Sequence, residues 1–153
     1  MLLPSLSAAK ARAQGIQCVS NMKQLQLAWQ FYSDDNEDRL VPNLPGPMPR
    51  STNTTWCAGW YTTPAGPDNT DLALLQNSLL GRHTASTAIY KCPGDRSVNV
   101  RSFAMNNFMN GMNFDGVGTV FRTSSAIPRP ADFFVFLDED ASTINDALFR
   151  LDI

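Results

Sequence analysis

The apolar residues between positions 2 and 33 follow the spacing of an α-helix. Over the first half they recur in steps of four and three, which places them on one stripe of a helical surface: Leu2, Leu6, Ala9, Ala13 and Ile16. The apolar residues of the second half continue this stripe and then cover most of the circumference: Val19, Met22, Leu25, Leu27, Ala28, Trp29, Phe31 and Tyr32. The pattern predicts one long helix whose second half is buried, because a helix that is apolar nearly all round lies in a core.

The length of this helix predicts that it extends beyond a compact domain. At about 1.5 Å per residue, residues 2–33 form a rod of roughly 48 Å, whereas a compact chain of 153 residues has a radius of gyration of about 15 Å. We therefore expect the second half of the helix to pack against a globular head formed by residues 34–153 and the first half to protrude. A protruding helix with one apolar stripe needs a partner, either other helices or a lipid bilayer.

The rest of the chain carries the signals of short strands joined by turns. β-branched and aromatic residues concentrate in five segments that we expect to form strands: 54–61, 88–92, 100–105, 118–122 and 133–137. The last of these is apolar throughout, which predicts a central strand. A short helix is expected between a cap at Asn69 or Thr70 and a stop at Gly81. The expected fold class is α+β, with one long N-terminal helix packed on an antiparallel β-sheet.

Composition and charge narrow the classes of partner. The chain is 43% hydrophobic, which suits one globular domain with its own core. A net charge of −2 argues against a nucleic-acid footprint, so no nucleic-acid partner is expected. The charge is uneven, because Lys10, Arg12 and Lys23 are the only charged residues before Asp34. A basic rod beside an acidic head would suit a membrane surface on the rod side.

The sequence as given is not expected to span a membrane. It contains no run of about 20 apolar residues, and no charged start followed by an apolar middle that would mark a signal peptide. The chain nevertheless begins at Met1 already in helical register with the stripe that follows. From this abrupt start we expect an apolar segment upstream.

Two sets of residues could carry binding or catalysis. Asp138, Glu139 and Asp146 follow the last expected strand, and carboxylates gathered in this way are hard oxygen ligands suited to calcium. A solvated acidic loop is the alternative. The same carboxylates could serve a hydrolase, although no nucleophile and no second acid at a predictable separation accompany them. Trp56 and Trp60, together with the Asn-rich loop at 106–116, could bind glycans in an extracytoplasmic module. For the two tryptophans, a place in the core is the alternative.

The cysteines and the histidine leave their roles open. Cys18, Cys57 and Cys92 have spacings that fit no zinc motif. They are either small buried hydrophobic residues or, outside the cytoplasm, one disulfide with a free thiol. The only histidine, His83, has no cysteine or carboxylate partner close in sequence, so we expect a surface or structural role for it.

Seven stretches, in a specific order, are similar to a known family of bacterial proteins. They span almost the whole chain: LLPSLSAAKARAQ (2–14), CVSNMKQLQLAWQFYSDDN (18–36), WCAGW (56–60), ALLQNSLLG (73–81), YKCPGDRS (90–97), RSFAMNNFMNG (101–111) and IPRPADFFVFLDEDASTIND (127–146). In these stretches the chain resembles the pilin-like, G-type pseudopilins of type II secretion, of the kind that planctomycete and verrucomicrobial bacteria carry in many copies.

The resemblance implies a pilin-like fold and a structural, non-enzymatic role. Such prepilin-like proteins are subunits of a type II secretion pseudopilus or of a type IV pilus-like filament, in the periplasm or at the cell surface. They are anchored in the inner membrane by an apolar segment upstream, after cleavage of a leader and methylation of the new N-terminus. The implied partners are other pilin-like subunits, which pack against the N-terminal helix. In this chain the contacting face would be Leu2, Leu6, Ala9 and Ala13.

The resemblance also bears on the cysteines and on calcium. Cys18 and Cys92 lie within recurring family motifs, so the resemblance implies these two as the pair if a disulfide forms. Cys57 stands where a small apolar residue is more usual. The G-type class resembles calcium-stabilised heads, which agrees with a site at the carboxylates 138, 139 and 146. The chain departs from the family at both ends, since neither the anchor with its cleavage site nor the usual downstream segment is in this sequence.

Overall fold

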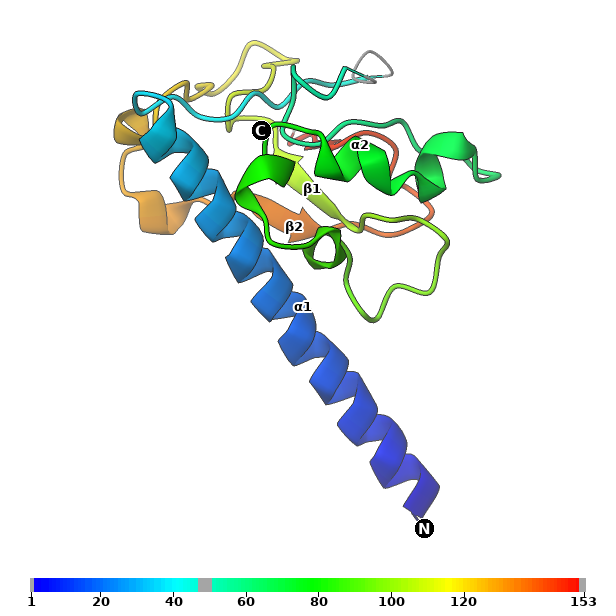
Figure 1. The fold of residues 1–153 in the computed structure, drawn as a ribbon. Coiled ribbons are helices and arrows are strands. Elements are labelled where there is room, and N and C mark those ends of the chain that lie inside the picture. The colour runs from blue at the N-terminus through cyan, green and yellow to red at the C-terminus, as the bar shows by residue number, and fades with distance from the viewer. Residues whose placement is uncertain (1, 47–50, 152–153) are drawn as a thin grey trace.

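The computed structural model describes residues 2–46 and 51–151, with side chains from Ser5 onward. Its dominant element is helix α1 (Leu2–Asp35), which packs along one side of a small head and extends well beyond it (Figure 1). Residues 5–17 are exposed except for Gln14, which is half-buried. The prediction of one long helix with a protruding first half is confirmed, and the helix ends at Asp35 instead of Ser33.

Helix α1 ends where the backbone becomes left-handed. Glu37 and Asp38 have φ values of 56° and 67°. The side chain of Asn36 donates a hydrogen bond to the carbonyl of Tyr32 (2.7 Å), and the N–H of Asp38 donates to the carbonyl of Ser33 (3.0 Å). These bonds satisfy carbonyls of the last turn that have no partner within the helix. The chain then turns back over the head.

The head is built on a three-stranded sheet with the order β2–β1–β3. The central strand β1 (Phe103–Asn106) is buried at all four residues. It pairs antiparallel with β2 (Phe136–Asp138) and parallel with β3 (Leu148–Phe149). The α+β class is confirmed, but the expectation of an antiparallel sheet is wrong because β3 makes the sheet mixed. The segment 133–137 is also not central, since only its end pairs and β1 takes the centre.

Three of the expected strands do not form in the described structure: 54–61, 88–92 and 118–122. The first is an irregular buried segment, in which the N–H of Trp56 donates to the carbonyl of Pro42 (2.8 Å). The second is the 3-10 turn η3 (Thr87–Tyr90), and the third makes one isolated bridge, at Phe121. Aromatic and β-branched residues therefore mark burial here and not strand pairing.

The expected short helix forms as α2 (Leu72–Gln76), but it ends at Gln76 and not at Gly81. Its cap is Asp71, whose carboxylate accepts the N–H of Ala73 (2.9 Å), and not Asn69 or Thr70. The remaining helical segments are short 3-10 turns: η1 (Pro67–Thr70), η2 (Gly81–His83), η4 (Ser124–Ala126) and η5 (Pro130–Asp132).

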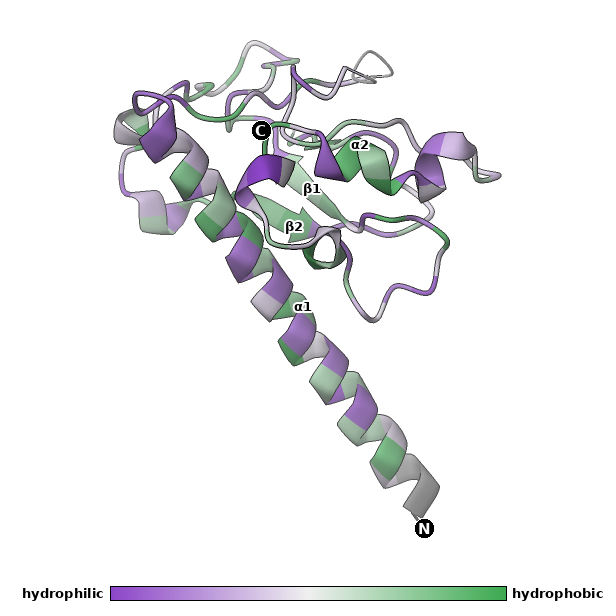
Figure 2. Cartoon of the chain, viewed as in Figure 1, coloured by the Kyte–Doolittle hydropathy of each residue, from purple (hydrophilic) through white to green (hydrophobic). Residues whose placement is uncertain are grey.

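One hydrophobic core joins the head to the second half of α1. It includes Leu25 and Trp29 of the helix together with Trp56, Phe103 and Phe136 of the head. Figure 2 shows apolar residues on the strands and on α2, whereas apolar and polar residues alternate along the protruding half of α1. Within the described residues, no helix combines the length and the apolar character needed to cross a membrane.

Candidate functional site

The protruding half of α1 presents an exposed apolar face. Leu6 and Ile16 are 69% and 73% exposed, and Ala9 and Ala13 between them are exposed as well. With about 3.6 residues per turn, these four residues share one side of the helix. Leu2, which the sequence assigns to the same face, has its side chain outside the described part of the structure.

This face continues past the head and not into it. Leu27 and Phe31 follow Ile16 by roughly three and four turns, which places them on the same side of the helix, and they are 56% and 55% exposed. Ser20 and Lys23 separate the two groups. We call the six exposed residues together the outer stripe: Leu6, Ala9, Ala13, Ile16, Leu27 and Phe31.

The opposite side of α1 packs on the head. Its buried residues recur at helical spacing: Cys18, Asn21, Leu25, Ala28 and Trp29. Leu25 follows Ile16 by about two and a half turns and so points away from the outer stripe. The predicted single stripe from Leu2 to Tyr32 is therefore wrong, and so is the expectation that the second half is buried nearly all round. The helix has two apolar faces, of which the head covers one.

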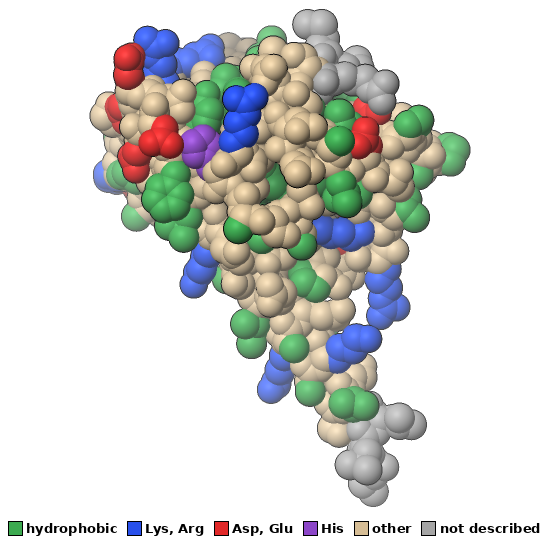
Figure 3. Space-filling view, in the orientation of Figure 1, with side chains coloured by type: hydrophobic (Ala, Val, Ile, Leu, Met, Phe, Trp, Pro, Cys, Tyr) green, Lys and Arg blue, Asp and Glu red, His purple; other side chains and the backbone are tan. Residues whose placement is uncertain are grey.

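Small residues and basic side chains accompany the outer stripe. Shallow hollows are lined by Ala8, Ala9 and Ala13 and, further along, by Gly15. A Cβ placed on Gly15 would meet nothing within 4 Å. On the face shown in Figure 3, Lys and Arg side chains project from the rod, while Asp and Glu side chains lie on the head. Small side chains allow another helix to approach closely.

An apolar groove of about 470 Å³ lies between α1 and the segment before β2. Met22 and Trp29 form the helix side, and Ile127, Phe133 and Val135 form the opposite side. The buried Nε1 of Trp29 has no hydrogen-bond partner. The sequence analysis did not find this groove, because its two walls are about one hundred residues apart and no local pattern connects them.

The three carboxylates predicted to bind calcium do not converge. Asp138 faces the thiol of Cys18, whereas Glu139 interacts electrostatically with Arg101 and Asp146. Adjacent residues of an extended chain point to opposite sides, which separates the first two carboxylates. Burial raises the pKa of both Asp138 and Glu139, and the positive charge of Arg101 opposes the rise at Glu139. In the described structure these three residues form no common ligand cluster, and calcium binding by them stays a prediction.

The carboxylate of Asp146 accepts backbone hydrogen bonds that hold two segments of the head together. Asp146 is buried, and its carboxylate accepts hydrogen bonds from the N–H groups of Gly46 (2.7 Å) and Leu148 (3.0 Å). It therefore connects the start of β3 to a loop about one hundred residues earlier. Two of its lone pairs are engaged in this way, which leaves fewer for a metal or for catalysis.

Replacing Asp146 with asparagine is expected to lower the free energy of unfolding by about 1.5–3 kcal/mol, because a charge-assisted hydrogen bond to a buried N–H is lost. Urea denaturation measures the change. The exposed Asp140, substituted in the same way, is the control and should change stability by less than about 0.5 kcal/mol. A loss at position 146 that occurs only with calcium present would contradict a structural role and assign the residue to a metal site.

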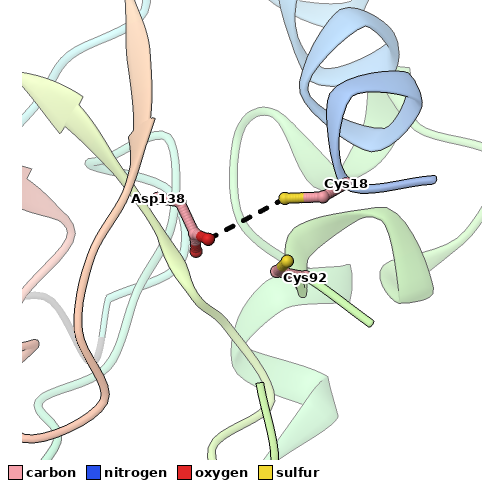
Figure 4. Close-up of side chains that lie close together, drawn as sticks. All are labelled: Cys18, Cys92 and Asp138. Atoms are coloured by element: carbon pink, nitrogen blue, oxygen red, sulfur yellow. Dashed lines mark hydrogen bonds between the residues drawn. The ribbon is translucent and has the colours of Figure 1, made fainter. Parts of the chain in front are cut away.

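Cys18 and Cys92 lie together, next to Asp138 (Figure 4). Their sulfur atoms and one carboxylate oxygen of Asp138 all lie within 4.8 Å of one another. Both residues are buried and are free thiols, and the Cys18 thiol donates a hydrogen bond to Asp138 Oδ2 over 3.8 Å. Burial, Cys92 and Asp138 together raise the pKa of Cys18 to about 12. The two cysteines that the family resemblance implies as a disulfide pair therefore lie next to each other, but in this structure they are free thiols.

The remaining candidates are structural. Cys57 is fully buried, and burial raises the pKa of its thiol to about 11. Trp56 is also fully buried, while Trp60 is half-buried, so the two do not form an exposed platform for a glycan. His83 lies 3.7 Å from a carboxylate oxygen of Asp35, a partner far from it in sequence, and its ring packs against Tyr32.

No family model, no curated protein and no solved structure matches this chain.

Proposed function

We propose that this chain is a non-enzymatic structural subunit of a pilin-like filament, either a type II secretion pseudopilus or a type IV pilus-like fibre. The filament stands outside the cytoplasm, in the periplasm or at the cell surface, and an apolar segment upstream anchors each subunit in the inner membrane. The observation that carries the proposal is the outer stripe, an apolar face that runs along the rod and past the head without intramolecular cover.

The energy of covering the outer stripe favours association. Fully burying a side chain such as Leu, Ile or Phe contributes about 1.5–3 kcal/mol. Leu6, Ile16, Leu27 and Phe31 each leave more than half of their side chains exposed, so a neighbouring helix that covers them gains several kcal/mol. This gain offsets the loss of translational and rotational freedom on association, which costs about 4–15 kcal/mol. Membrane anchoring of all subunits would lower that cost further.

The two-sided helix suits a fibre. The head covers one face of α1, so a neighbour must pack on the other face. When the neighbour contributes a different part of its surface to this contact, its own outer stripe remains available to the next subunit. Contacts between two different surfaces that do not close into a ring generate an open helical filament. The small residues Ala9, Ala13 and Gly15 allow close approach of the rods. The heads would then project outward from a core of helices.

Cross-linking through single cysteines placed on α1 tests this proposal. The full-length protein, in membranes of its host, would carry Ala9→Cys or Ala13→Cys on the outer stripe and be treated with a short thiol-reactive cross-linker. We expect a cross-linked dimer on denaturing gels, because each chain carries one reactive thiol and can be joined to one neighbour. The native cysteines are buried, so the unsubstituted protein provides the blank.

Ala11 supplies the matched control, because it is exposed and lies on the side of the rod away from the outer stripe. Ala11→Cys should give little cross-linking under the same conditions. Equal yields of cross-linked dimer from Ala11→Cys and Ala13→Cys would indicate random collision in the membrane. Monomers alone from every variant would refute a filament role through this helix.

A further inference from the structure

We propose that Cys18, Cys92 and Asp138 form a binding site for a thiophilic divalent cation of the zinc type. The three side chains come from α1, from the loop after η3 and from the end of β2, and they point toward one another (Figure 4). Two sulfur atoms and one carboxylate oxygen lie within 4.8 Å of one another. Among the described residues, this is the one such group of three His, Cys, Asp or Glu ligands. The site requires the free thiols that the structure shows and uses no residue of the outer stripe.

The donor atoms determine which cation the site would take. Thiolate ligands select zinc and other thiophilic ions, whereas calcium and magnesium require several oxygen ligands. Zinc accepts cysteine sulfur and carboxylate oxygen together and is nearly always four-coordinate. Three protein ligands leave one position for water, and the exposed side of Asp138 gives water access to that position. Cys18 and Cys92 provide the two sulfur ligands, and both residues are buried, so water does not reach the site from their side.

The distances are close to those of a tetrahedral centre. Metal–ligand bonds of about 2.0–2.3 Å place neighbouring ligand atoms about 3.5–3.8 Å apart. The sulfur of Cys18 and Oδ2 of Asp138 are already separated by 3.8 Å. Because all three atoms lie within 4.8 Å of one another, the other two separations exceed the tetrahedral value by at most about 1 Å, which a small side-chain rotation can remove. The backbone of Cys92 is fixed in position by its N–H, which donates a hydrogen bond to Ser102 Oγ (3.1 Å).

The site lies where the rod leaves the head. The side chain of Gln14 donates to the carbonyl of Pro93 (2.9 Å), and that of Asn21 donates to the carbonyl of Lys91 (2.9 Å). Cys18 lies between these two residues on the same face of α1, opposite Cys92 in the same loop. A cation at this point would bond α1 to both the loop and β2. Metal binding would therefore stabilise the attachment of the rod, because only the folded chain brings the three ligands together.

Cobalt(II) titration of the reduced full chain tests the site, since cobalt replaces zinc and reports its ligands. Protein kept under anaerobic, chelator-free conditions should bind one equivalent of cobalt. We expect an intense near-ultraviolet charge-transfer band from sulfur to cobalt, visible bands of tetrahedral strength, and loss of both on adding zinc. Zinc should also raise the melting temperature, whereas magnesium should not.

Matched variants assign the ligands. Cys18→Ser and Cys92→Ser should abolish the charge-transfer band, and Cys57→Ala should leave it unchanged. Asp138→Asn should weaken cobalt binding by at least about tenfold, while Glu139→Gln, at the next position, should keep the affinity of the unsubstituted chain. The Asp138 variant alters an exposed side chain, so it keeps the test decisive if a cysteine variant fails to fold by circular dichroism.

Three results would overturn the site. The first is the absence of the charge-transfer band in folded protein with three reactive thiols. The second is a band of equal strength in folded Cys18→Ser or Cys92→Ser. The third is a native Cys18–Cys92 disulfide, seen as a single reactive thiol in denaturant, because a disulfide has no thiolate to bind a cation.

Discussion

Replacing Arg101 with alanine is expected to lower the free energy of unfolding by about 3–5 kcal/mol. Arg101 has no exposed surface. Its Nη1 and Nη2 donate hydrogen bonds to the carbonyls of Phe103 (2.7 Å) and Asp146 (2.8 Å). The guanidinium also stacks over the ring of Tyr61, 4.8 Å from its centroid. Alanine would leave both carbonyls buried without partners and open a cavity, and each unmet carbonyl costs about 1–3 kcal/mol.

The effect is large because Arg101 connects the start of β1 to two irregular segments. Phe103 begins β1, Asp146 precedes β3, and Tyr61 belongs to the segment where a strand was expected but did not form. The sheet has few strand-to-strand hydrogen bonds, so these loops depend on side-chain donors for their buried carbonyls. One buried guanidinium supplies two of the donors in a fixed fork geometry.

Urea denaturation and thermal melting measure this prediction. A loss of this size should lower the melting temperature by about 10 °C or more in a chain of this length. Arg101→Lys keeps the charge but not the fork, so it should recover only part of the stability. Arg96→Ala, an exposed arginine nearby, is the control and should change stability by less than about 0.5 kcal/mol. A loss below about 1 kcal/mol for Arg101→Ala would mean that water replaces the guanidinium.

The sequence predicted α1 well because helical periodicity is a local signal. Steps of three and four among Leu6, Ala9, Ala13 and Ile16 appear within a few turns and require no distant partner. The sequence did not predict which apolar face of α1 packs against the head. Leu25 is buried in the core and Leu27 is exposed to solvent, although both are apolar residues of the same turn. That choice depends on the shape of the head, which hydrophobic periodicity does not contain.

The strands were predicted less well because pairing is not local. Residues 54–61 have the composition of a strand, yet their backbone groups find loop carbonyls and side chains as partners. Strand β3 has only two residues and no sequence signal that separates it from a loop. Its parallel pairing with β1 follows from the path of the chain after β2. A preference for β-branched and aromatic residues therefore located buried segments without fixing their hydrogen-bond partners.

The same difference between local and long-range signals explains the outcome for the candidate sites. Asp138, Glu139 and Asp146 are close in sequence, and this proximity suggested a calcium site. In the structure Asp138 faces Cys18, whereas Glu139 interacts with Arg101 and Asp146. Cys18 and Cys92 fit no metal spacing because motif spacings describe ligands on one local unit. Their approach to Asp138 spans 120 residues from Cys18 and depends on packing α1 against β2. Only the resemblance to pseudopilins singled out these two cysteines beforehand.

Replacing Trp56 with alanine is expected to cost about 3–5 kcal/mol of folding stability, because it creates a large cavity in the core. The indole has no exposed surface. It stacks on Tyr90 at an interplanar angle of 10° with ring centroids 6.0 Å apart, and it meets the edge of Phe136 at 5.2 Å. Its Nε1 donates to Asn43 Oδ1 and to the carbonyl of Ala147, both at 3.1 Å. The ring thus links η3, β2 and the residue before β3.

Two further variants separate the contributions of the ring and of its N–H. Trp56→Phe keeps an aromatic ring but leaves the Asn43 and Ala147 oxygens without their donor, so about 1–3 kcal/mol should be lost. Trp60→Ala removes a half-buried ring and should cost less than Trp56→Ala. Urea denaturation followed by circular dichroism measures all three without depending on tryptophan emission. If Trp56→Ala unfolded no more easily than Trp60→Ala, Trp56 would not be a core residue and a role of the pair in ligand binding would regain support.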